Sequence, residues 1–498
     1  MKQKQIFLNA VTTFAQVLGS AAALFFLYRF LVRTIGVERL GIWSLVLATT
    51  SAVTLANQGF STSVTKFVAK YAAREQPGDV SSLVQTALIS LGSAVGILSI
   101  ALYPAAKWIL GVILPHPRLA EAVAILPFAL ASLWINILAS TLQAGLAGHE
   151  LITQRNYVVL GVSFVYLALS FLLVPRYSLL GLAYSQVAVA AASFLITWLL
   201  LRRRIAGLPF FPRRLSRSLF REMLAYGLHF QFITISQAVR EPVTKALLTK
   251  FGGLEMTGLY DMAMRWVVTF RELIVQANQV LVPTVAGLQE RDPESVPRVY
   301  RESYRLIFFL AIPCFAFLLV MSPVVSRIWL GHYDRVFVSF VALLACGWLV
   351  NVLANPAYVM DLGTGRLRWV SIGCATTGIL NATLGFLGGK YLGGMAVVGS
   401  VVFSLICGYL IVLVSYHREN RVPFTVLLPK ESAGIAISSL AGAAIFLPFF
   451  RASTAHAWFS MRAGAGLLAA LLCIVIVPMW IHPLRKRLIH WVLTRLPA

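Results

Sequence analysis

Five basic side chains lie inside long apolar runs of the sequence: Arg29, Arg240, Lys245, Arg265 and Arg271. A guanidinium stays charged and donates two parallel hydrogen bonds, a geometry that phosphate and carboxylate groups accept. An ionised side chain in a membrane interior costs about 2.5–3.5 kcal/mol on insertion scales, so it is expected to face protein or water. We therefore interpret the five residues as ligands for an anionic group.

Polar residues recur along one face of the apolar run 256–287. At about 100° per residue they fall within one stripe about 80° wide. The stripe consists of Asp261, Arg265, Thr269, Glu272, Gln276 and Gln279. An apolar helix with a single polar stripe is typical of a cavity wall, so we expect these residues to line a wet cavity. The alternative is that Asp261 pairs with Arg265, four residues on, inside a packed bundle.

The preceding apolar run, 223–248, carries a second polar group with Gln237, Arg240, Glu241 and Lys245. We expect Gln237 to line the same cavity and the two cations to bind the anion. Alternatively, Lys245 extends to the membrane surface, because it lies near the end of the run. The candidates for a proton or sodium site are acidic residues in or beside these runs: Glu241, Glu272 and Asp361.

Other polar residues are weaker candidates. Arg29 lies a few residues from the end of its run, so it either joins the anion path or extends to the headgroups. Asn57 and Gln58 end one apolar run, and Asn351 and Asn355 lie on one face of another. These amides either line the cavity or join neighbouring helices through hydrogen bonds.

No catalytic constellation is visible in the sequence. The stretch 385–391 has glycines and a lysine but lacks the spacing and the hydroxyl residue of a phosphate loop. The eight histidines show no metal-ligand spacing, and the five cysteines form no CxxC pair. We expect a protein that is not an enzyme and that uses no metal, no cofactor and no nucleic acid.

The composition sets the class of protein. Hydrophobic residues make up 59% of the 498 residues and charged residues 12%, against about 25% charged in an average soluble domain. The mean hydropathy is +0.80. Single soluble cores stop growing near 250–300 residues, so a soluble fold could not bury this much apolar surface. Because the runs approach the roughly 20 residues of a spanning helix, we expect an all-α polytopic membrane protein.

Fourteen apolar runs are visible: 8–32, 40–58, 83–105, 120–144, 156–175, 178–201, 223–248, 256–287, 304–326, 334–360, 368–389, 392–416, 432–450 and 459–481. We expect each to span the membrane. The longest stretches between runs, near 59–82, 202–222 and 288–303, are too short to form a separate domain.

The charges predict the orientation of these spans. Lys and Arg number 42 and Asp and Glu 18, a formal net charge of +24. With the N-terminus in the cytoplasm, the inward segments carry the larger share of cations, which the positive-inside rule requires. We therefore expect both termini in the cytoplasm. The Arg-rich stretch 202–221 is predicted to fix this topology and to contact anionic lipid.

Short patterns repeat at nearly constant spacing. One pattern occurs as Gly36-x-Glu38-x-x-Gly41-x-Trp43 and as Gly253-x-Glu255-x-x-Gly258-x-Tyr260. Another occurs as Gly181-Leu182-Ala183 and as Gly394-Met395-Ala396. Six runs separate the copies, so both copies cross the membrane in the same direction. We therefore predict two parallel six-helix lobes around a central cavity, followed by two extra helices.

The predicted divisions follow from this repeat. They are an N-terminal lobe over 1–203, a basic cytoplasmic linker over 204–222, a C-terminal lobe over 223–418, two additional helices over 430–482 and a basic cytoplasmic tail over 483–498.

Two stretches resemble a known family: FFLYRFLVRTIGVERLGIWSLV at 25–46 and NQGFSTSVTKFVAKYAA at 57–73. They are similar to polysaccharide transporters, the Wzx-type flippases of the multidrug/oligosaccharidyl-lipid/polysaccharide exporter superfamily. The resemblance implies a flippase in the bacterial cytoplasmic (inner) membrane. Its substrate would be an undecaprenyl-diphosphate-linked oligosaccharide, the repeat unit of O-antigen (in lipopolysaccharide biosynthesis) or of an exopolysaccharide. The protein would move it from the inner to the outer leaflet by alternating access through a cationic cavity.

The same resemblance implies a monomer that uses no cofactor and works beside glycan polymerase or ligase machinery. Alternatives remain: a multidrug exporter of organic cations from the same superfamily, a membrane glycan polymerase or ligase, and another carrier such as one for lipid II. A cation exporter would be expected to present acidic side chains, whereas the runs 223–248 and 256–287 hold more cations than acids. A polymerase or ligase would be expected to have a large outer loop, which this chain lacks.

Overall fold

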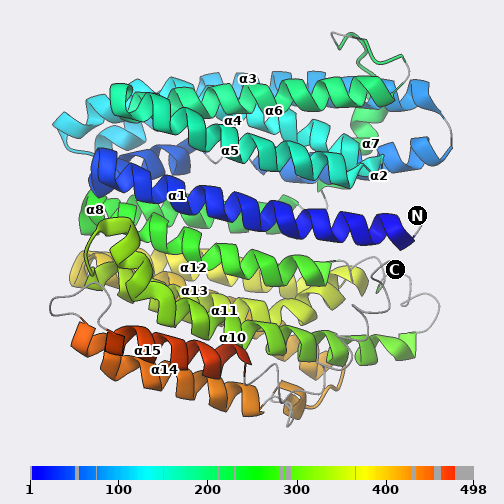
Figure 1. The fold of residues 1–498 in the computed structure, drawn as a ribbon. Coiled ribbons are helices and arrows are strands. Elements are labelled where there is room, and N and C mark those ends of the chain that lie inside the picture. The colour runs from blue at the N-terminus through cyan, green and yellow to red at the C-terminus, as the bar shows by residue number, and fades with distance from the viewer. Residues whose placement is uncertain are drawn as a thin grey trace. The chain divides into compact units, whose positions relative to one another are not determined.

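The computed structural model describes residues 3–50, 55–74, 76–149, 151–205, 207–209, 212–228, 231–279, 285, 293–364, 366–427, 433–453 and 461–476. Within these ranges every regular element is a helix (Figure 1). The predicted all-α class is therefore confirmed.

The chain divides into two compact units, residues 1–258 and 259–498. The helices of the first unit are α1 (Gln3–Thr50), α2 (Leu55–Ala73), α3 (Pro77–Ile113), α4 (His116–Gly148), α5 (Ile152–Tyr177), α6 (Leu179–Arg204), α7 (Arg217–Leu228) and the first part of α8 (Gln231–Gln279). The second unit holds the rest of α8, α10 (Val296–Leu330), α11 (Arg335–Thr364), α12 (Arg368–Leu392), α13 (Gly394–Glu419), α14 (Ala433–Ser453), α15 (Met461–Leu471) and the short elements Pro293–Ser295, Phe424–Leu427 and Leu472–Ile476.

Long apolar helices confirm a protein that crosses the membrane many times. Among the described residues, nine helices are long and apolar enough to span a membrane: the Thr12–Thr50 part of α1, and α3, α4, α5, α6, α10, α11, α12 and α13. Both α1 and α8 contain two helices joined at a kink, and α2 follows α1 in the chain. With that division the helices follow the order of the fourteen predicted spans. The predicted domain boundaries stay predictions.

Several helices extend beyond the apolar runs. The stretch 59–82, which was expected to lie between two spans, is mostly helical, because α2 continues to Ala73 and α3 begins at Pro77. Similarly, α7 occupies part of the predicted linker and overlaps the start of the predicted run 223–248. Helical turns at a bundle end can face water, so they need not be apolar, and hydropathy alone misses them.

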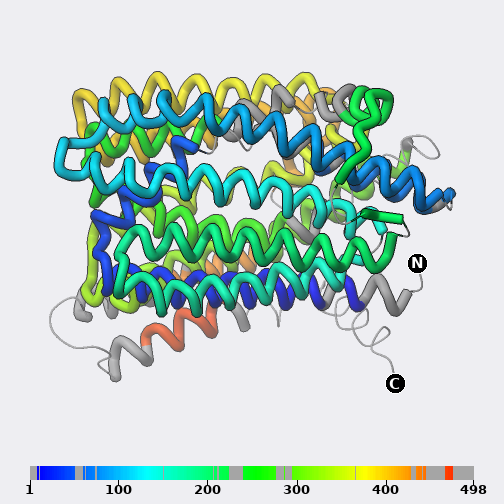
Figure 2. Tube along the Cα trace, turned by 90° about the horizontal axis from the view of Figure 1, so that it is seen from above, coloured from blue at the N-terminus to red at the C-terminus, as the bar shows by residue number. Residues whose placement is uncertain are grey.

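The kinks of α1 and α8 lie at the first glycines of the predicted repeat. Gly36 has φ 81° and ψ 165°, and Gly253 has φ 85° and ψ 173°. This region of backbone space is costly for any residue with a Cβ atom, so glycine is required at both positions. The dark-blue trace of α1 changes direction at this kink in Figure 2.

The second glycines of the repeat allow two backbones to touch inside the first unit. A Cβ atom on Gly41 would lie 2.1 Å from the carbonyl oxygen of Leu254, and one on Gly258 would lie 2.4 Å from that of Val37. The contact is reciprocal, because Val37 and Gly41 correspond to Leu254 and Gly258 in the repeat. The repeated glycines therefore have one common physical cause, which is a close crossing of equivalent helix starts.

Packing within the first unit places α4 against α6, α3, α2 and α1. Leu83, Leu142, Leu146 and Leu201 are fully buried in this contact. In the second unit α12 and α13 approach as closely, since a Cβ atom on Gly408 would lie 2.5 Å from the carbonyl oxygen of Gly373. Such small-residue contacts are the usual means by which membrane helices pack.

The two C-terminal helices pack within the second unit. α14 contacts α10 and α15. Leu467, Ala470 and Ile474 form one apolar cluster with Val320 of α10. This places the last two predicted spans against a helix of the preceding six.

The glycine crossing predicts a measurable loss of stability. Gly258→Ala should lower the free energy of unfolding by about 1–3 kcal/mol, because the added methyl group overlaps a backbone carbonyl. Thermal unfolding of the purified protein in detergent measures this. Gly161→Ala is the control, since a Cβ atom there meets open space. Equal unfolding temperatures for the two variants would show that the close contact does not exist.

Candidate functional site

The second part of α8 carries the predicted pair of Asp261 and Arg265. Arg265 Nε lies 3.9 Å from Asp261 Oδ2, so the pair is present but long. The Asp261 side chain is 6% exposed and that of Arg265 is 50% exposed. The structure thus contains the pair that was the alternative expectation, with the acid buried and half of the arginine side chain exposed.

Arg271 lies in a more enclosed setting between α8 and α11. Its Nε donates to Asn351 Oδ1 at 2.8 Å, and Nη1 pairs with the carboxylate of the neighbouring Glu272. The guanidinium lies 5.0 Å from the ring centre of Trp348. Three predicted site residues therefore meet, and Asn351 joins two helices, which was the alternative expectation for this amide.

Trp348 is a site residue that the sequence reasoning missed. Its Nε1 lies 3.3 Å from Met264 Sδ, so the indole is oriented by α8 while its face contacts the Arg271 guanidinium. A cation above an aromatic face is attracted by the ring quadrupole. The sequence does contain a signal for Trp348: it precedes Asn351 by three residues, so both side chains lie on the same side of a helix.

The remaining candidates on these helices are more dispersed. Thr269 bonds the carbonyl of Arg265 within α8. Asn355 is buried on α11. The side chains of Gln276 and Gln279 lie outside the described residues, although both positions belong to α8. The structure therefore brings together Asp261 with Arg265, and Arg271 with Glu272 and Asn351.

The first part of α8 contains another pair. Lys245 Nζ lies 3.4 Å from Glu241 Oε1, and the lysine side chain is only 8% exposed. Lys245 is thus packed inside the first unit beside an acid, which does not fit a side chain reaching for headgroups. Arg240 is half-buried and precedes Lys245 by five residues. The two cations therefore flank Pro242, which lies inside the helix. The side chain of Gln237 lies outside the described residues.

The last candidates lie on other helices. Arg29 is half-buried on α1. Asn57 and Gln58 belong to α2, and their side chains lie outside the described residues. Asp361 is buried at the end of α11, with Arg366 and Glu419 as its charged neighbours.

The three acids predicted as alternatives for proton or sodium coupling each have their own charged neighbours. Glu241 pairs with Lys245, and Glu272 pairs with Arg271. Asp361 lies ten residues beyond Asn351 on α11, about 15 Å along the helix. Among the described residues, no group of three or more His, Cys, Asp and Glu side chains could hold a metal ion.

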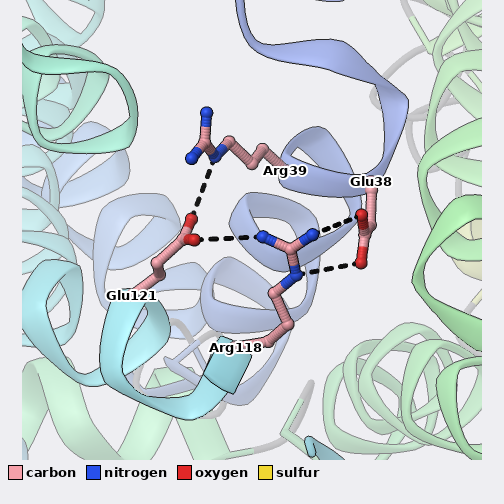
Figure 3. A network of polar contacts seen from close by, with 4 residues as sticks. All are labelled: Glu38, Arg39, Arg118 and Glu121. Atoms are coloured by element: carbon pink, nitrogen blue, oxygen red, sulfur yellow. Dashed lines mark hydrogen bonds and ion pairs between the residues drawn. The ribbon is translucent and has the colours of Figure 1, made fainter.

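A second charged network closes one end of the first unit (Figure 3). Arg118 of α4 donates to both oxygens of Glu38, at 3.0 and 2.7 Å, and to Glu121 at 3.1 Å. Arg39 donates to Glu121 at 3.1 Å. These bonds link the helix start after Gly36 to the first turns of α4. The sequence analysis missed this network, because its members lie about 80 residues apart.

The cationic residues can bind and orient an anion. Arg265 offers an accessible guanidinium beside a buried acid that limits its rotation. Arg271 is already held by an amide, a carboxylate and an indole, which positions its remaining donors. This arrangement suits recognition of a charged group, with no nucleophile or acid–base pair among the members described here.

The sequence also matches a known family. The family described as Polysaccharide biosynthesis protein matches residues 30–335, more than half of the chain. The chain belongs to this family. A comparison with curated proteins found no match.

Solved structures share the fold of this family member. An inward-facing multidrug resistance MATE family transporter of the MOP superfamily has a TM-score of 0.71 at 15% identity, over 82% of this chain and 96% of that one. The lipid II flippase MurJ, in an inward closed conformation, has a TM-score of 0.70 at 14% identity, over 97% of this chain and 100% of MurJ. A MOP superfamily transporter from Pyrococcus furiosus has a TM-score of 0.62 at 14% identity, over 84% of this chain and 95% of that one.

These likenesses show that the fold is the two-lobe MOP transporter fold, which confirms the predicted architecture. The match to MurJ covers nearly all of the chain, so it extends to the two C-terminal helices. The coverage by the MATE transporter is smaller. The solved structures named above are those of transporters and of a flippase.

The Arg271 contact predicts the effect of one substitution. Asn351→Leu should lower the free energy of unfolding by about 1.5–3 kcal/mol, because a hydrogen bond to a charged group is lost in a buried place. Asn351→Asp keeps an acceptor oxygen and should retain most of that stability. Thermal unfolding of both variants tests this, and an Asn351→Leu protein as stable as the wild type would contradict the contact.

Proposed function

We propose that this chain is a flippase for an undecaprenyl-diphosphate-linked oligosaccharide, the repeat unit of O-antigen or of an exopolysaccharide. It moves this lipid from the inner to the outer leaflet of the bacterial cytoplasmic membrane by alternating access through a cationic cavity. Membership of the polysaccharide biosynthesis family and the fold shared with a lipid II flippase support the class of cargo.

The diphosphate of such a cargo requires cationic side chains along its path, and α8 carries such side chains. A diphosphate that crosses the membrane must leave water with its charge. Its passage therefore needs a polar, cationic path. The observation that carries the proposal is the half-exposed Arg265 side chain on the polar stripe of α8. A buried carboxylate within 3.9 Å restrains it, and the fork of a guanidinium suits a phosphate.

The other candidates have supporting roles in this proposal. Arg240, Lys245, Arg271 and Arg29 are further contacts for the diphosphate or for acidic sugars. The polar residues that would line the sugar path are Asp261, Thr269, Glu272, Gln276, Gln279, Gln237, Asn57, Gln58, Asn351 and Asn355. Glu241, Glu272 or Asp361 would couple transport to protons or sodium.

The charge pattern supports the proposed orientation, and the family resemblance supports the other parts of the proposed setting. Both termini lie in the cytoplasm, the protein acts as a monomer, and glycan polymerase or ligase machinery receives the product. The structural likeness to a MATE transporter favours one alternative, a multidrug exporter. The exposed Arg265 argues against it, because an organic cation would be repelled there.

The proposal predicts a loss of export in a strain whose surface glycan depends on this gene. Arg265→Ala should reduce export about 10- to 100-fold, since charge-assisted hydrogen bonds contribute about 1.5–3 kcal/mol. Export by Arg265→Lys should lie between that of the wild type and that of Arg265→Ala, because lysine keeps the charge but lacks the paired donors of a guanidinium. Surface glycan is quantified after the amount of each variant in the membrane has been equalised.

Arg335→Ala is the matched control, since this exposed arginine begins α11 outside the site. Wild-type export by Arg265→Ala would remove the observation on which the proposal depends. Increased drug sensitivity of a deletion strain, with normal surface glycan, would favour the multidrug exporter.

A further inference from the structure

The chain that follows α6 is bound to α3 by buried polar side chains. Gln85 is 2% exposed, and its Oε1 accepts from the backbone N–H groups of Arg213 at 2.9 Å and Arg214 at 3.1 Å. A buried amide is costly unless its hydrogen bonds are made. Gln85 therefore holds the backbone between α6 and α7 at a fixed place.

Neighbouring side chains of α3 extend this attachment. Thr86 accepts from the N–H of Ser216 at 3.0 Å, and Ser81 donates to the carbonyl of Gly207 at 3.2 Å. Gln85 Nε2 also donates to Ser81 Oγ at 3.0 Å, which joins these two side chains. The connecting chain is thus anchored at both its beginning and its end.

The helix that follows, α7, is held by α2. Ser63 donates to the carbonyl of Met223 at 2.9 Å, and Lys70 Nζ lies 3.3 Å from Glu222 Oε1. Met223 is fully buried. α7 therefore contacts both α2 and α3.

This anchoring presents a row of arginines outward. All seven are exposed, and we refer to them as the basic strap: Arg202, Arg203, Arg204, Arg213, Arg214, Arg217 and Arg221. The sequence 202–221 contains no acidic residue. Leu215, between the arginines, is 57% exposed. A topology signal needs only positive charge, so it does not explain why the backbone that carries these charges is fixed by a buried network.

We propose that the basic strap is a pre-ordered binding surface for the headgroups of anionic phospholipids. The strap begins at the end of α6 and is anchored at the start of α3, and both helices are long enough to span the membrane. The strap therefore lies at headgroup level. Guanidinium groups bind phosphate oxygens through paired donors. Leu215 enters the acyl boundary beside them, a combination typical of surfaces that bind anionic membranes.

The test uses the full-length protein in non-ionic detergent, with phosphatidylglycerol as the probe and phosphatidylcholine as the uncharged reference. Native mass spectrometry measures the bound lipid. The combined variant Arg213→Gln, Arg214→Gln, Arg217→Gln should lose at least about tenfold in affinity for phosphatidylglycerol, since each basic residue near an anionic surface contributes about fivefold. Unchanged affinity would overturn the proposal.

A matched control removes three arginines elsewhere. Arg298, Arg301 and Arg305 are exposed on the first turns of α10, where Glu294 and Glu302 accompany them. Their replacement by Gln should change the affinity by less than about twofold. A loss equal to that of the strap variant would show that only net charge matters, which contradicts a specific surface.

Two further arms test the order of the strap and the identity of its ligand. Gln85→Leu keeps every arginine but removes the anchor, and it should weaken phosphatidylglycerol binding severalfold. Wild-type affinity in this variant would overturn the pre-ordering.

Inorganic pyrophosphate should not displace the lipid at equal concentration. Displacement would assign the surface to a diphosphate, and the phospholipid proposal would then be wrong.

Discussion

The close approach of two backbones at Gly41 and Gly258 is the constraint on which the candidate site depends. Each glycine removes the side chain that would separate the helix starts, and each preceding kink glycine sets the direction of its helix. Asp261 and Arg265 follow Gly258 by three and seven residues, so all three lie on one face of α8. The register of the crossing therefore fixes where on α8 the candidate anion ligands are presented.

The first turns of α3 and α10 both anchor later parts of the chain, with different chemistry. Ser81 and Gln85 lie near the start of α3, and Tyr300 and Tyr304 lie near the start of α10. In both units these positions hold chain at or beyond the end of the sixth helix of the repeat: Tyr300 bonds His417 Nε2 at 2.7 Å, and Tyr304 donates to the carbonyl of Leu427 at 3.2 Å. The anchor uses amide and hydroxyl groups in the first unit, at the arginine-rich segment, and aromatic side chains in the second unit.

Local features of this protein could be predicted from its sequence, and distant contacts could not. Spans follow from apolar runs, and the Asp261–Arg265 pair follows from a separation of four residues. The glycine repeat is visible because its spacing is constant. Arg271 with Asn351, and Glu38 with Arg118, join residues about 80 positions apart, which no periodicity encodes. The helical turns of α2 beyond its apolar part, and α7 itself, lie at a bundle end where hydropathy gives no signal.

The two polar networks of the first unit lie at opposite ends of α3, and they respond differently to ionic strength. The network of Glu38, Arg39, Arg118 and Glu121 consists of partly exposed ion pairs, which dissolved salt screens over a Debye length of about 8 Å under physiological conditions. Gln85 and Thr86 make neutral, buried hydrogen bonds that salt does not weaken. Raising the salt concentration therefore weakens the ion pairs between α1 and α4. The hydrogen bonds of Gln85 and Thr86 at the other end of α3 keep their strength.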